Sequence, residues 1–124
     1  MTMSSHTKQM VDCLRNLQAT NPSIKASSVV NANGQIMAST FPTDIDEARV
    51  VGISASLLSA SEQLMSEMKS GALNRITIEG SNKLIVLTAV GEDAILAVLA
   101  RSEADLGRIF QDTRSTIDDL VRLF

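Results

Sequence analysis

Three consecutive apolar segments constrain the fold more than any other feature of this chain. Residues 75–79 (RITIE) alternate apolar and polar side chains, whereas residues 83–90 (KLIVLTAV) and 94–100 (AILAVLA) are almost continuously apolar. The links at 80–82 and 91–93 are too short for anything but antiparallel hairpins. Antiparallel strands usually keep one polar face, so strands that are apolar on both faces predict helices on both sides of the sheet. The segments therefore predict a three-layer α/β/α sandwich.

Two more strands are predicted before these, over residues 26–31 and 35–40. Asn33-Gly34 lies between them. Asn tolerates a positive φ and Gly has no Cβ, which suits a two-residue type I′ hairpin turn. A ligand-binding glycine loop is the alternative, but the flanking residues contain no phosphate-binding pattern. We therefore expect a hairpin.

Two amphipathic segments predict helices at the ends of the chain. Apolar residues recur at helical spacing over 6–19, and the pattern stops before Pro22 because proline disfavours a helical residue in front of it. Residues 104–123 carry one apolar stripe, which is typical of a helix that packs on a core.

The longest predicted helix covers residues 44–69. Asp44 with Glu47 has the spacing of a capping box, and Thr43 is an equally good cap. Gly71 supplies a stop that accepts a left-handed conformation. About 25 residues at about 1.5 Å each give a helix about 38 Å long, which spans a small domain.

The elements together predict one domain over residues 1–124 in the order α-β-β-α-β-β-β-α, with residues 1–5 flexible. Cys13 is the only cysteine, so no intrachain disulfide forms and a thiolate zinc site would lack ligands. We expect a reducing cytoplasm. The start of the chain has no apolar core typical of a signal peptide, and no segment is long enough for a membrane span, so we expect no direct membrane insertion.

The composition also argues against nucleic acid as a partner. The formal net charge is -3, and aromatic residues make up 2% of the chain. A negative chain has no general attraction to phosphates, and bases would find few rings on which to stack.

The long helix carries two apolar sectors, centred about 130° apart at 100° per residue. The first contains Val50, Ile53, Leu57, Ala60, Leu64 and Met68. The second contains Ala48, Val51, Ala55, Leu58 and Met65. One sector is enough to cover a sheet, so we predict that the second, which is rich in small residues, contacts a helix of another chain. The alternative is that both are buried within one domain.

The alternating strand at 75–79 is predicted to lie at a sheet edge, where unpaired backbone groups can accept a second strand. Arg75, Thr77 and Glu79 therefore join the predicted interface, although Arg75 and Glu79 are also explained as ordinary protection of an edge. Edge pairing together with helix packing predicts a two-fold symmetric homodimer.

Catalytic patterns are missing. The chain has no Walker-type loop, no paired dinucleotide glycines and no thiolate pair, and its only histidine is His6 near the start. Helix capping accounts for Asp44, Asp46 and Glu47. We predict no catalytic residue, no metal ligand and no cofactor.

Four stretches together resemble the Roadblock/LC7 family, including bacterial and archaeal members related to the gliding-motility regulator of a Ras-like GTPase. They are SSVVNANGQIMAST, ARVVGISASLLSASEQLMSEM, RITIEGSNKLIVLTAVGEDAILAVLA and SEADLGRIFQDTR. The resemblance covers nearly the whole chain from about Met10. It implies a profilin-like fold: a five-stranded antiparallel sheet with the long helix on one face and the terminal helices on the other.

The resemblance also implies a function. Family dimers commonly join edge strands and pair their long helices, and members act as regulators or scaffolds for small Ras-like GTPases or as light chains in motor complexes. Some bacterial members stimulate GTP hydrolysis, but no shared catalytic residue maps onto this chain. We therefore expect a non-enzymatic homodimer that binds a small Ras-like GTPase. The alternatives are a sensory module that binds a small ligand between helix and sheet, and a structural subunit of a larger assembly.

Overall fold

The computed structural model describes residues 5–31, 33–92 and 94–124. Within them lie three helices and one five-stranded sheet, in the predicted order. The elements are α1 (Ser5–Thr20), β1 (Ile24–Asn31), β2 (Ile36–Ser39), α2 (Glu47–Glu67), β3 (Arg75–Glu79), β4 (Lys83–Val90), β5 (Ala94–Arg101) and α3 (Leu106–Val121). Of the five residues predicted to be flexible, four lie outside the described residues, and Ser5 begins α1.

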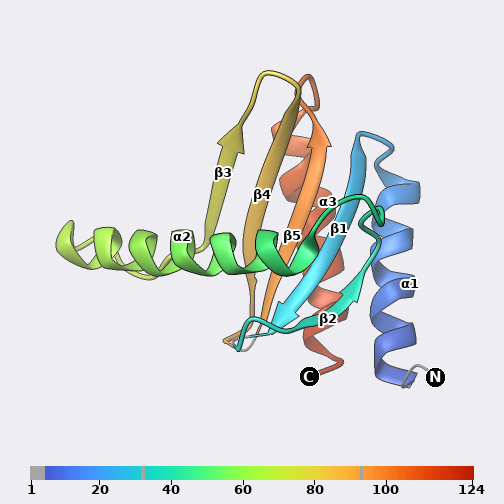
Figure 1. Ribbon diagram of the computed structural model, residues 1–124, viewed down its shortest axis with the longest axis horizontal. Coiled ribbons are helices and arrows are strands. Elements are labelled where there is room, and N and C mark those ends of the chain that lie inside the picture. The colour runs from blue at the N-terminus through green and yellow to red at the C-terminus, as the bar shows by residue number, and fades with distance from the viewer. Residues whose placement is uncertain (1–4, 32, 93) are drawn as a thin grey trace.

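The strands are ordered β2-β1-β5-β4-β3, and every neighbouring pair is antiparallel. Figure 1 shows α2 crossing one face of this sheet and α3 behind the other face, while α1 lies alongside β1 and β2 and packs against α3. The three-layer sandwich predicted from the apolar strands is therefore confirmed. The predicted hairpins at 80–82 and 91–93 also join their strands, although Asp93 lies outside the described residues.

The main core lies between the sheet and the helices α1 and α3. Along β5, Leu96 and Val98 face this layer and are almost fully buried, together with Leu14, Ile109 and Leu120 from the two helices. The residues that alternate with them, such as Ile95 and Leu99, point to the α2 face and are only half-buried. Helix α2 therefore covers its face of the sheet incompletely.

The turn between β1 and β2 is longer than predicted. Asn31 donates its backbone N–H to the carbonyl of Gln35 (2.9 Å), and Gly34 donates to the carbonyl of Asn31 (3.0 Å). The predicted hairpin is present, but these bonds connect Asn31 with Gly34 and Gln35, so the prediction of a two-residue type I′ turn at Asn33-Gly34 is wrong; residue 32 lies outside the described residues. Gly34 has a φ of 79°, as expected for the left-handed residue that ends such a loop.

Helix α2 begins three residues later than predicted, because neither Asp44 nor Thr43 caps it. The backbone folds into a turn in which the N–H of Ile45 donates to the carbonyl of Pro42 (3.2 Å). Asp46 is the cap, and its carboxylate accepts from the N–H of Arg49 (3.2 Å).

Glu47, predicted to complete a capping box, has another contact. Its carboxylate accepts a hydrogen bond from the hydroxyl of Ser39 (2.6 Å). The first residue of α2 is thereby tied to the end of β2, and this contact fixes where the helix enters the face of the sheet.

The end of α2 also differs from the prediction. The left-handed residue that ends the helix is Lys69, with a φ of 52°, and not Gly71. Lys69 donates its N–H to the carbonyl of Ser66 (3.1 Å), and Ser70 donates to that of Met65 (2.9 Å). These two bonds form a Schellman motif, in which glycine is the usual residue at the position of Lys69.

Candidate interaction surface

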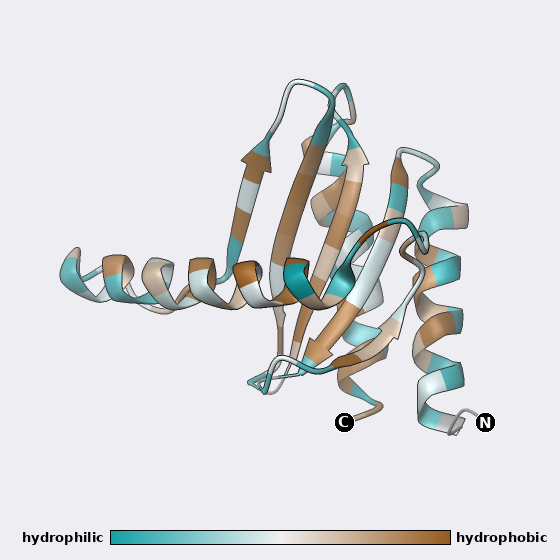
Figure 2. Ribbon diagram, viewed as in Figure 1, coloured by the Kyte–Doolittle hydropathy of each residue, from teal (hydrophilic) through white to brown (hydrophobic). Residues whose placement is uncertain are grey.

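Helix α2 is longer than the sheet is wide. Its 21 residues span about 32 Å, whereas five strands spaced about 4.8 Å apart span only about 19 Å between the outer two. Because α2 crosses the strands, it continues past β3 into solvent (Figure 1). Apolar residues persist along the projecting part (Figure 2), where Leu64 is 62% and Met68 is 68% exposed.

The burial along α2 shows which sector faces the sheet. Val51, in the second predicted sector, is only 7% exposed, and Leu58 from the same sector is half-buried. Both line a small hollow over Val30 and Leu87 of the sheet. Ile53, in the first sector, is 61% exposed. The helical periodicity of the sequence identifies both sectors. It does not show which of the two faces the sheet, and that is seen only in the structure.

A groove runs along the exposed side of α2 where the sheet is bare. We call it the apolar groove; it has a volume of about 330 Å³. Its principal lining residues are Phe41, Ile45, Val50, Ile53, Leu57, Ile78, Ile85 and Leu99. Ile78, Ile85 and Leu99 form a continuous cross-strand row, since Ile78 pairs with Ile85 and Ile85 with Leu99. The groove is therefore an apolar part of the sheet surface that is exposed to solvent.

Strand β3 lies at the sheet edge, as its alternation predicts, and in the described part of the chain only β4 pairs with it. Its apolar residues Ile76 and Ile78 point to the α2 face. Arg75, Thr77 and Glu79 point to the other face, where the guanidinium carbon of Arg75 lies 4.1 Å from the ring centroid of Phe110. These three side chains are therefore directed away from the apolar groove.

The remaining residues of the predicted interface occupy varied positions. Ala48 and Ala55 are exposed on α2, and Met65 is half-buried. Val51 is enclosed within the chain and is not accessible to a partner. Phe41 and Ile45, which line the apolar groove from the loop before α2, were not singled out from the sequence. Their only signal is that two large apolar residues occur in a polar loop.

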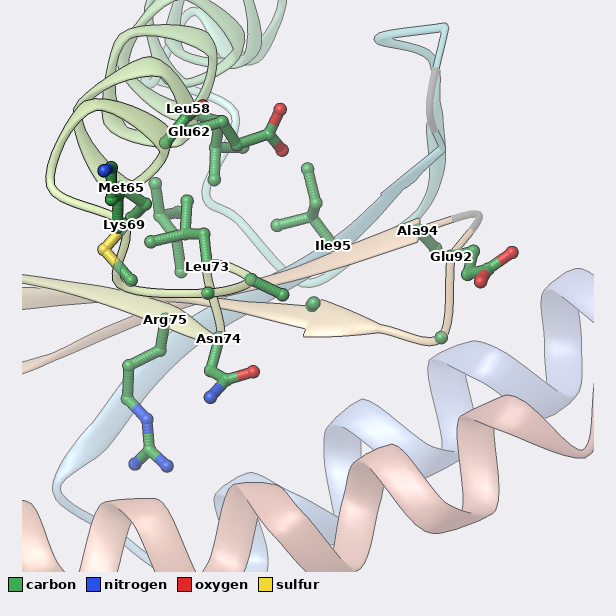
Figure 3. Close-up of a pocket in the computed structure, with 16 residues that line it drawn as sticks. Leu58, Glu62, Met65, Lys69, Leu73, Asn74, Arg75, Glu92, Ala94 and Ile95 are labelled. Atoms are coloured by element: carbon green, nitrogen blue, oxygen red, sulfur yellow. The ribbon is translucent and has the colours of Figure 1, made fainter.

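A second hollow lies on the opposite side of α2, and we call it the α2 cleft. It has a volume of about 700 Å³ and lies between the second half of α2, the 71–74 connection and the ends of β4 and β5. Leu58, Met65, Leu73 and Ile95 supply its apolar surface (Figure 3). The charged residues around it are Glu62, Lys69, Arg75 and Glu92.

No cluster of three or more His, Cys, Asp or Glu side chains in the described part of the chain is placed to hold a metal ion. Among the same residues, no helix is long and apolar enough to cross a membrane. What distinguishes this surface is the exposed apolar area along α2 and the open strand edge beside it.

Comparison with known proteins decides the family. A model of the Roadblock/LC7 domain matches residues 10–100. This chain belongs to the Roadblock/LC7 family. The resemblance noted from the sequence is thereby confirmed, and the match includes α2, β3 and the two hairpins that frame the surface described above.

Two proteins of Methanocaldococcus jannaschii resemble the chain along most of its length. An uncharacterized protein of Methanocaldococcus jannaschii is 30% identical over 101 residues, which cover 82% of this chain and 88% of the relative. A second uncharacterized protein of the same organism is 33% identical over 86 residues, or 69% of this chain and 75% of the relative.

Solved structures share the fold. Myxococcus xanthus MglB superposes with a TM-score of 0.88 at 19% identity, over 100% of this chain and 93% of that one. The gliding protein MglB of Thermus thermophilus gives 0.86 at 14% identity, with coverages of 99% and 93%. Schizosaccharomyces pombe profilin gives 0.66 at 13% identity, with 92% and 98%. The Roadblock/LC7 chain therefore has the profilin-like sandwich, with MglB as a close structural neighbour.

Proposed function

We propose that this protein is a cytoplasmic, non-enzymatic homodimer that binds a small Ras-like GTPase and acts as its regulator or scaffold. The observation that carries the proposal is the projection of α2 past the open edge strand β3, with exposed apolar residues along its length. A monomer would leave this area in contact with water, at a cost of about 25 cal/mol for each Å² of apolar surface.

A second copy related by a two-fold axis at β3 would cover this area. Antiparallel pairing of the two β3 strands would satisfy their open edges and extend each sheet. The projecting half of each α2 would then lie over the sheet of the other protomer, beside that protomer's own α2 and in its apolar groove. This arrangement uses Ile53, Leu64 and Met68 as interface residues, together with Ile78 and Ile85 of the groove, and it leaves out the enclosed Val51.

Self-association has precedent among structural neighbours, one of which is described as MglB with a tetrameric arrangement. The GTPase part of the proposal rests on family membership, because Roadblock/LC7 proteins act as regulators or scaffolds of Ras-like GTPases. Whether hydrolysis of GTP is accelerated is a separate question, since no side chain of this chain is assigned to the nucleotide.

Light scattering coupled to gel filtration tests the dimer. The expected mass is twice the 13.3 kDa of the chain, and a 13.3 kDa species at micromolar concentration would refute the dimer. A pull-down tests the partner: immobilised protein should retain at least one Ras-like GTPase from a panel loaded with GDP or a GTP analogue. If it retains none in either nucleotide state, the GTPase assignment fails even when the dimer holds.

A further inference from the structure

A third hollow lies on the face of the sheet opposite α2, and we call it the α3 hollow. It has a volume of about 440 Å³ and lies between α3, the start of β3 and the end of β4. The proposed dimer uses α2, the apolar groove and the outer backbone edge of β3. The α3 hollow lies on the other face of the sheet, on the side of β3 that pairs with β4, so a second copy would leave it open.

Two arginine side chains reach this hollow from different elements. Arg75 comes from the start of β3, and Figure 3 shows it and Asn74 pointing away from α2, toward the helices on the other face. Arg114 comes from α3, one turn after Phe110, whose ring contacts Arg75. Like charges repel, so two guanidiniums at one hollow have a cost in free energy that a bound anion would offset.

Neither arginine has a carboxylate partner. Arg101, Arg108 and Arg122 each form an ion pair elsewhere on the chain, whereas Arg75 and Arg114 form none within the described residues. The positive charge at the α3 hollow is therefore not neutralised by the chain itself, although the whole chain has a net charge of -3.

The contact with Phe110 leaves the hydrogen-bonding groups of Arg75 free for a ligand. The guanidinium carbon of Arg75 lies 4.1 Å from the ring centroid. A guanidinium over a ring contacts it through its flat face, and its N–H groups point outward in the guanidinium plane. The ring thus holds the side chain in position, and a donor that is already held loses less conformational entropy on binding.

The uncharged polar side chains of the hollow are also able to donate. The amides of Asn74 and Gln111 and the hydroxyl of Thr88 line it and form no hydrogen bond within the described part of the chain. Thr88 is the cross-strand partner of Arg75, so the two side chains lie on the same face of the sheet. Among the described residues, Asp118 brings the one carboxylate that lines the hollow. The hollow is therefore rich in donors and has an excess of one positive charge.

We infer that the α3 hollow binds an oxyanion, the carboxylate or phosphate group of a small molecule, between Arg75 and Arg114. Guanidinium N–H groups match the oxygens of both groups, and hydrogen bonds of this kind between charged partners are the strong ones. The neighbouring amides and the hydroxyl of Thr88 donate to the remaining oxygens. This site goes beyond the proposed function and does not depend on it, because every side chain that it uses belongs to one protomer and lies outside the surface assigned to the second copy.

The test is a titration with inorganic phosphate and, separately, with glutarate, which carries carboxylates in place of phosphate. Binding is followed by the arginine Nε–H and backbone amide signals in ¹⁵N NMR spectra, with sodium chloride at the same ionic strength as the control. We expect saturable shifts of Arg75, Arg114 and Thr88 with at least one of the two anions and none with chloride. The anion that binds more tightly identifies the group that the site prefers.

Two double variants with the same change of charge locate the binding. Arg75→Gln with Arg114→Gln should weaken binding at least about fivefold, since it removes both guanidiniums. Arg15→Gln with Arg49→Gln changes two exposed arginines outside the hollow and should alter binding within about twofold. Arg114→Gln alone leaves the contact of Arg75 in place and should weaken binding at least about threefold, so the test does not depend on the fold of the double variant.

Asp118→Asn tests the site in the opposite direction. It removes the carboxylate that lines the hollow and keeps both guanidiniums, so it should tighten binding at least about twofold, a gain that damage to the fold does not produce. Shifts that rise linearly without saturation, or that chloride reproduces, overturn the oxyanion site. Shifts that persist unchanged when Arg75 and Arg114 are both replaced overturn it as well.

Discussion

The guanidinium of Arg75 lies over the ring of Phe110, with its central carbon 4.1 Å from the ring centroid. The contact joins the start of the edge strand β3 to the first half of α3, on the face of the sheet opposite α2. It gives β3 a side-chain anchor within its own chain while its outer backbone edge stays open. Arg75 therefore supports the edge strand and does not need a second protomer as its partner.

A double-mutant cycle measures this contact. Arg75→Ala and Phe110→Leu should show a coupling energy of about 0.5–1 kcal/mol, the usual range for an exposed cation–π pair. Urea unfolding of the two single variants and the double variant gives the value. Arg122→Ala, at the exposed C-terminal cap of α3 and about three turns from Phe110, is the control and should show no coupling to Phe110→Leu. A coupling energy near zero between Arg75 and Phe110 would mean that the cation–π contact does not stabilise the fold.

Substitutions along α2 should separate interface from core. Ile53→Glu should convert the dimer to a monomer that stays folded, because Ile53 is exposed in the single chain and buried only by a second one. Leu58→Glu should lower the free energy of unfolding of the chain itself by about 1–3 kcal/mol, since Leu58 faces the sheet. Light scattering and urea unfolding distinguish the two effects.

The matched control for this pair is Ser59→Glu, which adds the same carboxylate at an exposed position of α2. It should leave both the mass and the stability unchanged. A dimer that survives Ile53→Glu and dissociates with Ser59→Glu would show that the helix presents a different face to its partner.

Lys69→Gly should stabilise the protein. Lys69 holds a left-handed conformation that costs a residue with a Cβ about 1 kcal/mol and costs glycine little, so we expect a gain of about 0.5–1 kcal/mol. Lys69→Ala keeps the Cβ and should give no such gain. The urea concentrations at the midpoint of unfolding are compared for the wild-type protein, Lys69→Gly and Lys69→Ala. Similar gains for both variants would attribute the effect to the lysine side chain and not to the backbone.

Asp112 should contribute more to the free energy of unfolding than its ion pair with Arg108 alone would. One carboxylate oxygen accepts from the buried side-chain amide of Asn21 (3.0 Å) and also from the guanidinium of Arg108 (3.1 Å). Asp112→Ala leaves the Asn21 amide without this partner and should cost about 1–3 kcal/mol. Arg108→Ala removes only an i,i+4 surface pair and should cost about 0.5 kcal/mol or less. Thermal and urea unfolding provide the values, and equal costs would argue against the Asn21 contact.

The sheet and its two covered faces were predictable because the signals are local. Alternation over 75–79, the apolar runs after it and the short links between them are determined within a few residues, and they predicted β3, β4 and β5 almost residue by residue. The ends of α2 were not predictable in this way. Asp46, Asp44 and Thr43 are all acceptable caps locally, and the contact of Glu47 with Ser39, eight positions earlier, accompanies the choice of Asp46.

The interaction surface, like the fold, was predictable only in part from the sequence. By itself, the sequence determined that α2 has two apolar sectors and that 75–79 lies at an edge, because helical and strand periodicities are properties of neighbouring residues. Only the tertiary structure decided that Val51 and Leu58 face the sheet while Ile53 and Leu64 face solvent, because this depends on how the helix is rotated over the strands. Packing of Val51 and Leu58 against the sheet accompanies that rotation. The second half of α2 projects past β3 because the helix is longer than the sheet is wide.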